Sequence, residues 1–562
     1  MGEEGVVFVR RASGLVREIG WFSALTMVLG HVIGGGINWH STKDAVYYAG
    51  ADVPMAFFIA GVPSVLLATC FALMAVMMPR AGGDYIYITR AMDPLVGFMA
   101  SWAFWFTEAI SFGIIGAFDS VFWGMSIWMY GLMQYKAGVA GAKKIMDAGA
   151  WMTGFWGQII VGSLLVIIFC IIALFGTKAL AYVMNVIVII PLITGFLTIG
   201  YFAWGAVTPG LAKAKFEAIF GAGTWQKIMD TAPTVLPPEG AEKFTLEKFH
   251  RGASWAATMG MATPATWAYI GFTCSSFFGS EVKDPSRSLM ISMVLGSICI
   301  LVYYVILSGT CWAAYGDFIT AYNYIWESDQ THYYKLVRAG KTPDIPEPVL
   351  PGILGVEEAP EGILPFFAAI LAYPNTFIMV LLIVTGAIWL MNDIPAFLMV
   401  TSRSIFAWSF DRFFPEFIAA VNERWHSPHW AITITGIIGI IGVIANATNW
   451  FLAMVGTTVL AIWRYLFDAM AATILPYKRP EIWEKGLRLT VAGIPLITIL
   501  GFIAFVWWNY IFWFACLALD PTTIATYAVW LGFGLFIFVA YWVYNQKRGI
   551  DPRTIYQEIP PA

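Results

Sequence analysis

The sequence predicts an all-α membrane protein of about twelve transmembrane helices, and two observations lead to this fold class. First, 59% of the 562 residues are hydrophobic and only 12% are charged, whereas about a quarter of a soluble protein is charged. Second, the apolar residues form long runs such as 183–203 and 289–310. A helix needs roughly 20 apolar residues to cross a bilayer, so each run is long enough to form a span.

Twelve such runs follow one another along the chain. The expected spans are 20–40, 53–78, 95–129, 156–176, 181–207, 255–280, 288–314, 374–404, 429–447, 450–475, 490–517 and 522–545. An even number of spans places both termini on one side. The short loops on that side carry basic residues such as Arg80, Arg90, Arg403 and Arg479, and basic short loops favour the cytoplasm. We therefore expect a multi-pass protein of the plasma membrane with both termini cytoplasmic.

The spans divide the chain into a core, two peripheral helices and two tails. The expected boundaries are 1–19 for the N-terminal tail, 20–476 for the core, 477–545 for the two peripheral helices and 546–562 for the C-terminal tail. Two long outer loops, 208–254 and 315–373, interrupt the core. Residues 362–372 are apolar, but joined to the next span they would form a helix of roughly 60 Å. We expect a separate, lid-like outer helix there.

The charge balance and the cysteines exclude several classes of protein. The net charge is −3, which gives no indication of nucleic-acid binding. None of the six cysteines lies in a CxxC pair, so the pattern predicts neither a zinc site nor a disulfide framework. The sequence contains no HExxH, GxSxG or P-loop motif. We therefore expect no enzyme activity, no metal and no cofactor.

Two spans contain residues that interrupt a helix halfway across the membrane. The first holds three consecutive glycines, Gly34 to Gly36, each about 1 kcal/mol less favourable in a helix than alanine. The sixth holds Gly271 and a run of hydroxyl residues, with Pro264 before it. Irregular backbone occurs at this depth only where it is buried in protein or lines a cavity. The alternative is that the glycines let helices pack closely.

A pair of breaks has a chemical consequence that close packing lacks. Free N–H groups at the start of a half-helix attract a carboxylate, and free carbonyls at the end of one attract an ammonium group. An amino acid carries both groups. Broken spans at corresponding places in two halves of a chain indicate the binding site of a transporter.

Four short motifs occur in order along the chain. They are Gly34-Gly35-Gly36-Ile37, Pro79-Arg80-Ala81-Gly82-Gly83-Asp84-Tyr85, Glu281-Val282-Lys283-Asp284-Pro285, and Ser402-Arg403 followed by Asp411 and Pro415. Together they resemble the motifs of amino acid permeases of the amino acid–polyamine–organocation (APC) superfamily, which have the LeuT-type fold. The resemblance covers about 15–430. It implies two inverted five-helix repeats, spans 1–5 and 6–10, plus two peripheral helices.

The resemblance also implies where a substrate binds. The glycines of the first span would meet its carboxylate, and carbonyls of both broken spans would meet its ammonium group. The expected substrate-binding residues are Ile33, Gly34, Gly35, Gly36, Trp267, Tyr269, Ile270, Gly271 and Thr273. Trp267 matches a position where relatives keep an aromatic gate, although it could also be an ordinary packing residue. Aromatic candidates for the side-chain end of the pocket are Trp102, Trp105, Trp267, Phe272 and Trp389.

Two departures from the family pattern narrow the substrate. Asn38 stands where an aromatic residue is usual, and Thr273 stands where several relatives have an acid. That acid accompanies cationic substrates or proton coupling in parts of the family. Its absence argues against an arginine or polyamine exchanger and favours neutral or apolar amino acids.

Ionisable residues inside the spans are functional candidates by default, because charge is costly there. Glu108 and Asp119 are eleven residues apart in the third span, which places them within about 20° of one helix face. Asn392 and Asp393 lie in the eighth span at the depth where sodium-coupled relatives hold an ion next to the first break. His31 precedes the glycines by one turn, and histidine is the residue type suited to a switch near neutral pH. These residues are candidates for coupling transport to H⁺ or Na⁺.

Each of these residues also has a structural interpretation. Glu108 could be a buried acid that is hydrogen-bonded to neighbouring helices, Asp393 a cap for backbone freed by Pro395, and His31 a packing residue. Arg464 and Asp468, four residues apart in the tenth span, are expected to form a structural ion pair.

The leading hypothesis is a secondary transporter that moves amino acids by alternating access, as a proton or sodium symporter or as an exchanger. The first alternative keeps the fold but changes the cargo to a purine, a polyamine or another organic cation. The second is a non-transporting membrane sensor or complex subunit. The two outer loops are long enough to bind a partner protein, but no residue pattern indicates one.

Overall fold

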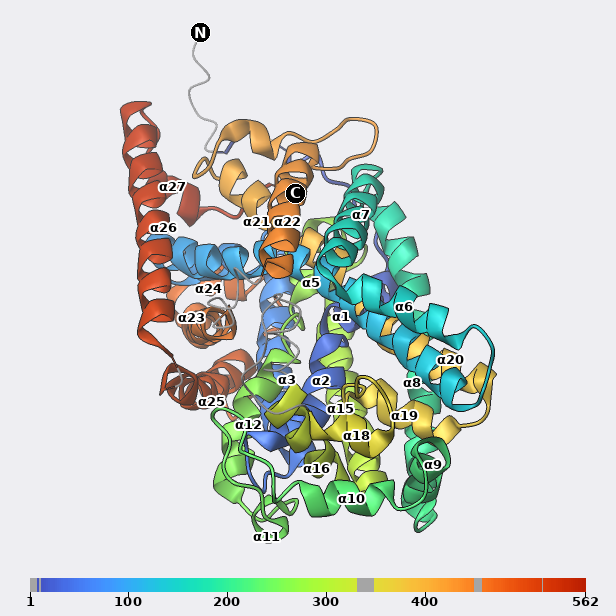
Figure 1. The fold of residues 1–562 in the computed structure, drawn as a ribbon. Helices are drawn as coiled ribbons and strands as arrows, with labels where there is room; N and C mark the ends of the chain where they lie inside the picture. The colour runs from blue at the N-terminus through green and yellow to red at the C-terminus, as the bar shows by residue number, and fades with distance from the viewer. Residues whose placement is uncertain (1–7, 10–11, 331–347, 449–456, 518, 562) are drawn as a thin grey trace.

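The computed structural model describes residues 8–9, 12–330, 348–448, 457–517 and 519–561. Nearly all of these residues are helical, and ten helices are long and apolar enough to cross a membrane. This confirms the predicted class, a multi-pass all-α membrane protein (Figure 1). The ten are α3 (Val53–Met77), α5 (Pro94–Lys136), α7 (Phe155–Leu174), α8 (Thr177–Val207), α14 and α15 (Pro285–Met290 and Gly296–Tyr315), α20 and α21 (Thr376–Met391 and Asp393–Phe410), α22 (His429–Ala447), α23 (Thr457–Lys478), α25 (Leu496–Leu517) and α26 (Pro521–Lys547).

The two remaining expected spans are the two that carry helix-breaking residues. The first consists of α1 (Trp21–Val32) and α2 (Gly35–Lys43). The sixth consists of α12 (Trp255–Trp267) and the short α13 (Cys274–Phe277). Together with the ten continuous spans they make twelve among the described residues, as the sequence predicts. The start of the expected tenth span falls on 449–456, outside the described residues.

Several boundaries differ from the predicted ones. Helix α5 runs to Lys136 instead of ending at 129, and α21 runs to Phe410 instead of 404. The eleventh span begins at Leu496 rather than 490 because a small hairpin precedes it. Its strands, β1 (Thr490–Val491) and β2 (Ile494–Pro495), are antiparallel, and both turn residues have positive φ, as tight hairpins require.

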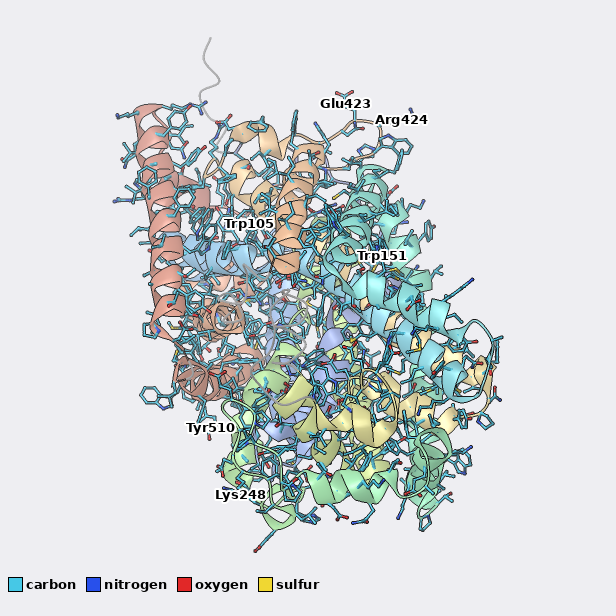
Figure 2. The ribbon with its side chains drawn as sticks, in the orientation of Figure 1. Trp105, Trp151, Lys248, Glu423, Arg424 and Tyr510 are labelled. Carbon is cyan, nitrogen blue, oxygen red and sulfur yellow. The ribbon has the colours of Figure 1, made fainter. Side chains whose placement is uncertain are left out.

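The connections gather at two opposite ends of the molecule (Figure 1). We call one end the loop face, because it carries the helices of the two long loops. These are α9 (Leu211–Phe220), α10 (Thr224–Thr231), α11 (Leu246–Phe249), α16 (Phe318–Ile325), α18 (Val349–Leu354) and α19 (Leu364–Ala372). Helix α19 ends at Ala372, before Pro374 and the next span, so the separate helix expected at 362–372 is confirmed. Lys248 marks this face in Figure 2.

We call the other end the termini face, because the described ends of the chain pack there. It carries α4 (Asp84–Ala91), α24 (Pro480–Trp483) and α27 (Pro552–Gln557), and Glu423 and Arg424 mark it in Figure 2. Arg479 Nη2 donates to the carbonyl of Gln557 at 2.7 Å, and Ile19 forms a parallel bridge with Val282. A further helix that the sequence did not indicate, α6 (Ala142–Thr153), packs along α5. The division into core, peripheral helices and tails stays a prediction.

Candidate functional site

The first span is interrupted at Ile33 and Gly34. Helix α1 ends at Val32, where the next residue adopts an extended conformation with ψ of 92°. Gly34 has φ and ψ of −143° and −138°, and α2 starts at Gly35. The Asn38 side chain donates through Nδ2 to the Gly34 carbonyl at 3.0 Å. The residue that departs from the family pattern thus binds the interrupted backbone itself.

The Asp393 carboxylate lies directly against this break. A Cβ atom added to Gly34 would overlap the carboxylate, so only glycine leaves room for it. The eighth span thus faces the first break at Asp393, as expected. Asn392, buried beside it, ends α20, and its backbone carbonyl lies close to Gly30. The N–H groups at the start of α2 therefore have a protein carboxylate as their neighbour.

The sixth span is interrupted over six residues, from Ala268 to Thr273. Gly271 has φ of +111°, which other residues rarely adopt. Its carbonyl accepts from the Cys274 N–H at 2.8 Å, and the Trp267 carbonyl accepts from the Ile270 N–H at 3.1 Å. Tyr269 and Thr273 are buried in the same stretch. The carbonyl of Trp267, predicted to meet an ammonium group, is thus already hydrogen-bonded within the break.

The two breaks contact each other. A Cβ atom on Gly36 would lie 2.6 Å from Ala268 Cα, and one on Gly271 would lie 2.6 Å from the His31 carbonyl. The first span starts at the termini face and the sixth at the loop face, so they run in opposite directions, as inverted repeats require. The glycines therefore serve close packing as well as the breaks, and both interpretations of them apply.

Tyr304 of α15 links both breaks and was not singled out by the sequence. Its hydroxyl lies 2.6 Å from the Val32 carbonyl and 2.9 Å from the Ala268 carbonyl. These are the last residue of α1 and the first residue after α12. The ends of helices leave carbonyls without partners, and here the single O–H of Tyr304 is shared between two of them. The only signal in the sequence is a pair of tyrosines, Tyr303 and Tyr304, inside an apolar span.

Four of the predicted ionisable residues gather beside the breaks. His31 Nε2 lies 3.2 Å from Glu108 Oε2, and both side chains are buried. Asp393 interacts electrostatically with Asp119 and Glu108. Among the described residues, no three His, Cys, Asp or Glu side chains lie close enough to hold a metal ion. The arrangement is a spread group of buried acids rather than a coordination sphere.

A second buried group of charges continues from Glu108 toward the termini face. Arg464 lies 3.2 Å from Asp468 and 3.4 Å from Asp84, and it also interacts electrostatically with Glu108. Its guanidinium stacks 3.7 Å from the Phe104 ring centre. The predicted pairing of Arg464 and Asp468 is confirmed. The sequence did not show that Asp84, from the motif Pro79 to Tyr85, joins it.

Ion pairs close the loop face above the breaks. Lys43, at the end of α2, lies 2.7 Å from Glu327 and also pairs with Glu361. Its ammonium group lies over the rings of Trp39 and Trp326, and the Lys43 side chain is 2% exposed. The end of α2 is thus fixed to the segment 315–373 at the loop face.

Other ion pairs close the termini face, and they are made by the family motifs. Arg403 donates to Glu281 at 2.9 and 3.0 Å and to the Thr177 hydroxyl at 2.6 Å. Arg90, five residues after the motif Pro79 to Tyr85, pairs with Asp411 at 2.7 Å. Residues far apart in the sequence therefore meet at this end, and the breaks lie between two closed faces.

The aromatic candidates for the pocket divide into two groups. Trp102 stacks on Trp530 of α26 at 4.5 Å, and Trp105 lies in the same aromatic cluster. These two face the peripheral helix, so their assignment to the pocket was wrong; α5 presents different faces along its 43 residues. Trp267, by contrast, lies against Gly36 and 5.4 Å from the His40 ring.

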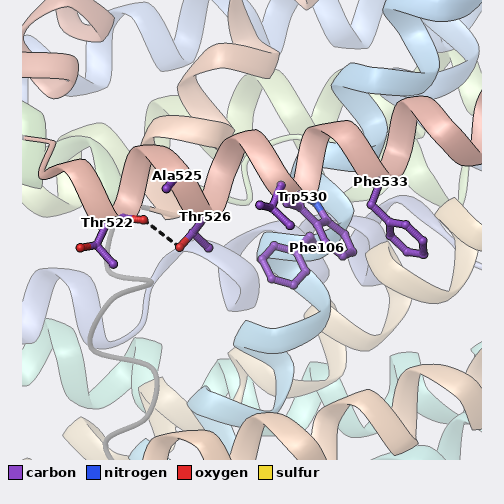
Figure 3. A pocket seen from close by; sticks show the side chains of 7 residues that line it. Phe106, Thr522, Ala525, Thr526, Trp530 and Phe533 are labelled. Atoms are coloured by element: carbon purple, nitrogen blue, oxygen red, sulfur yellow. Dashed lines mark hydrogen bonds between the residues drawn. The ribbon is translucent and has the colours of Figure 1, made fainter.

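Phe272 and Trp389 complete the set. Phe272 lies 5.2 Å from the Tyr465 ring, and Trp389 lies 6.2 Å from Tyr303. One hollow on the described surface, of about 460 Å³, lies between α5 and α26 around Phe106 and Trp530, with Thr522, Thr526 and Phe533 along its edge (Figure 3). None of its lining residues belongs to either break.

Comparison with known proteins identifies the family. A model of the amino acid permease family matches residues 19–559. The chain belongs to this family. It is therefore a member of the APC superfamily, as the four motifs predicted.

Individual relatives of this permease are transporters rather than enzymes. It is 23% identical to the methylthioribose transporter of Bacillus subtilis (strain 168) over 549 residues, 96% of both chains. It is 23% identical to the serine/threonine exchanger SteT of that organism over 301 residues, 53% of this chain and 55% of the relative. It is 37% identical to the Asc-type amino acid transporter 1 of Homo sapiens over 92 residues, which span only 17% of that relative.

Proposed function

We propose that this permease moves small amino acids with neutral side chains across the membrane by alternating access. The observation that carries the proposal is the pair of touching, oppositely directed breaks between two closed faces. Helix α2 begins at the break and directs N–H groups toward it, which suits a carboxylate. Carbonyls near Ile33, Tyr269 and Ile270 suit an ammonium group. Trp267 covers the glycines as a gate would.

The position of Asp393 leads to a proposal for coupling. A substrate carboxylate at the start of α2 would lie close to the Asp393 carboxylate, which already contacts Gly34. Two unit negative charges 4 Å apart repel by about 4 kcal/mol at an effective dielectric constant of about 20. An amino acid therefore binds well only when a cation neutralises Asp393. A proton does this by binding to the carboxylate itself.

The neighbouring acids support a proton as the coupling ion. Neither Glu108 oxygen accepts a hydrogen bond of good geometry from a described residue, and burying an ionised carboxylate without such partners is costly. His31 Nε2 lies 3.2 Å from Glu108 Oε2, close enough for a proton to pass between the two side chains. We propose Asp393 as the coupling residue, and Glu108 with His31 as the pair through which its proton passes. Sodium coupling and exchange are outcomes of the test below.

The relative that aligns with this chain over 549 residues favours a second candidate cargo. Its name states that it transports methylthioribose, a neutral sugar derivative without a carboxylate. Such a cargo could sit at the breaks while Asp393 stays ionised. Purines, polyamines and other organic cations have no comparable observation in their favour. A sensor or complex subunit is disfavoured because the named relatives are transporters.

Proton uptake on binding separates these candidates. Serine and methylthioribose are titrated calorimetrically into the full-length protein in two buffers with different ionisation enthalpies. The proposal expects about one proton taken up per serine, and serine affinity that rises by up to about tenfold for each pH unit lowered. Asp393→Asn abolishes the uptake, whereas Asp147→Asn, on the exposed side of α6, leaves it unchanged.

Three other results would redirect the proposal. Serine binding that requires sodium and takes up no proton would assign sodium as the coupling ion. Serine binding without either ion would indicate exchange. Methylthioribose binding without proton uptake, with no amino acid bound, would establish the second candidate.

We further propose that the termini face is cytoplasmic and that the protein lies in the plasma membrane. Arg80, Arg90, Arg403 and Arg479 all lie at this face, and short basic loops stay inside. Labelling of a single cysteine introduced at Arg424 with a membrane-impermeant reagent tests the orientation. Labelling of intact cells at this position would contradict it.

A further inference from the structure

A second hollow, of about 660 Å³, lies at the C-terminal end of α26. On one side it is lined by Ala540, Tyr541 and Tyr544 of α26 and by Arg548 directly after that helix. On the other side it is lined by residues 412 and 414–416, which follow α21. The Asn545 side chain donates to the Arg412 carbonyl at 2.9 Å. This hydrogen bond holds the end of α26 against the segment after α21.

The level of this hollow in the membrane follows from the sequence of α26. Apolar side chains such as Phe536, Val539 and Val543 are exposed along the helix, as expected where it faces lipid. The apolar run ends there and is followed by Asn545, Gln546, Lys547 and Arg548. Tyrosine and basic residues in this order mark the level at which hydrocarbon meets the headgroups. The hollow therefore extends from the headgroup layer into the hydrocarbon.

The charged residues that line the polar end of the hollow are two arginines and one glutamate. Arg412 and Arg548 both donate to the same oxygen, Glu416 Oε1, at 2.8 and 2.6 Å. Burial raises the pKa of Glu416, but the hydrogen bonds and charges of the two arginines outweigh it and leave this pKa below its usual value. Glu416 is thus ionised at neutral pH. Two guanidinium groups share one carboxylate, and the Arg548 side chain is 40% exposed.

The hollow near the start of α26 provides a comparison on the same helix. It is lined by Phe106, Trp530 and other residues that carry no charge (Figure 3), so it suits acyl chains alone. The hollow at the end of α26 has an aromatic and aliphatic wall as well as a cationic end. Only the second has the chemistry to distinguish one headgroup from another.

We propose that the hollow at the end of α26 binds a phospholipid with an anionic headgroup. The phosphodiester lies against Arg548, whose exposed guanidinium can make a favourable bidentate contact. The glycerol and the first part of the acyl chains lie along Tyr541, Ala540 and Phe414. A basic residue near a membrane surface adds about 1 kcal/mol to the binding of anionic lipid, which is about fivefold in affinity.

Lipid binding to the full-length protein is measured by native mass spectrometry with phosphatidylglycerol and, separately, with phosphatidylcholine of the same acyl chains. We expect phosphatidylglycerol to bind about fivefold more tightly. Arg548→Gln removes this preference. Arg424→Gln, which changes an exposed arginine on the same face, leaves it intact.

A variant with the opposite expected effect on lipid preference controls for misfolding. Glu416→Gln removes the competing carboxylate, so it should increase the preference for phosphatidylglycerol, which a damaged protein would not do. Equal binding of the two lipids by the wild type would overturn the proposal, as would an equal loss in Arg424→Gln. Protection of Arg548 from a guanidine-modifying reagent by inorganic phosphate as well as by the lipid would overturn it in favour of a site for free anions.

Discussion

The two breaks differ in length and in what surrounds them. The first involves two residues, Ile33 and Gly34, and has the Asp393 carboxylate against it. The second involves six residues, Ala268 to Thr273, and has a histidine ring and a tyrosine hydroxyl against it. The first therefore concentrates negative charge beside helix N–H groups, and the second supplies carbonyls and strained backbone. We therefore propose that the first break carries the coupling and that the second sets the shape of the site.

The largest effect is expected at Gly271, which defines the second break. Gly271→Ala places a Cβ atom 2.6 Å from the His31 carbonyl at a backbone angle that costs roughly 1–2 kcal/mol for other residues. Transport should be abolished in reconstituted vesicles. Gly200→Ala, in α8, meets no atom within 4 Å and should transport like the wild type. Full activity of Gly271→Ala would show that the second break is not required in this form.

The second-largest effect is expected at Asp393, where one substitution separates the coupling of transport to a proton gradient from the binding of substrate. Asp393→Asn keeps the volume beside Gly34 but removes the ionisable group. We expect counterflow of substrate to persist, whereas accumulation against a gradient in response to an imposed pH difference is lost. Flux of labelled serine in proteoliposomes measures both. Accumulation that survives in Asp393→Asn would place the coupling group elsewhere.

A smaller effect is expected where one side chain serves both breaks. Tyr304→Phe removes a hydroxyl that is bonded to the Val32 and Ala268 carbonyls. Leaving buried acceptors without a donor costs about 1–3 kcal/mol. The variant should melt at a lower temperature than the wild type, and Tyr510→Phe, on the exposed surface of α25 (Figure 2), should not. An unchanged melting temperature for Tyr304→Phe would argue that the breaks are held by other contacts.

The smallest effect is expected at the contact between the two breaks. His31→Gln keeps a polar side chain but removes the proton exchange with Glu108. We expect the proton-driven rate to fall by a few fold, about 1 kcal/mol, while serine affinity at low pH stays the same. Rates measured at two pH values provide the comparison. A loss of affinity without a change in the pH profile would make His31 a packing residue.

The number and order of spans could be predicted because long apolar runs need no tertiary information. The two breaks could be predicted for a similar reason, since glycines at mid-membrane depth have few structural explanations. The contacts around them could not be, because they depend on residues hundreds of positions apart. Tyr304 of α15 lies against carbonyls of two other spans, Val32 and Ala268. Asp84, from the loop after the second span, pairs with Arg464 of the tenth span.

The assignment of Trp102 and Trp105 to the pocket shows where the pattern misleads. Both lie on a helix that passes the breaks, but they face Trp530 of the peripheral helix α26. A helix of 43 residues turns its side chains toward several neighbours in succession, and only the packing decides which. Glu108, on the same helix, does face the breaks, because charge must be buried against a partner.

Analogues of the substrate test most directly whether the interrupted backbone holds both ends of a zwitterion. Serine, its methyl ester and N-acetylserine are compared by their affinity for the full-length protein. Each analogue lacks one charged end, so each should bind at least about 100-fold more weakly than serine, a loss of roughly 3 kcal/mol. An ester or an acetylated amine that binds as tightly as serine would contradict the account.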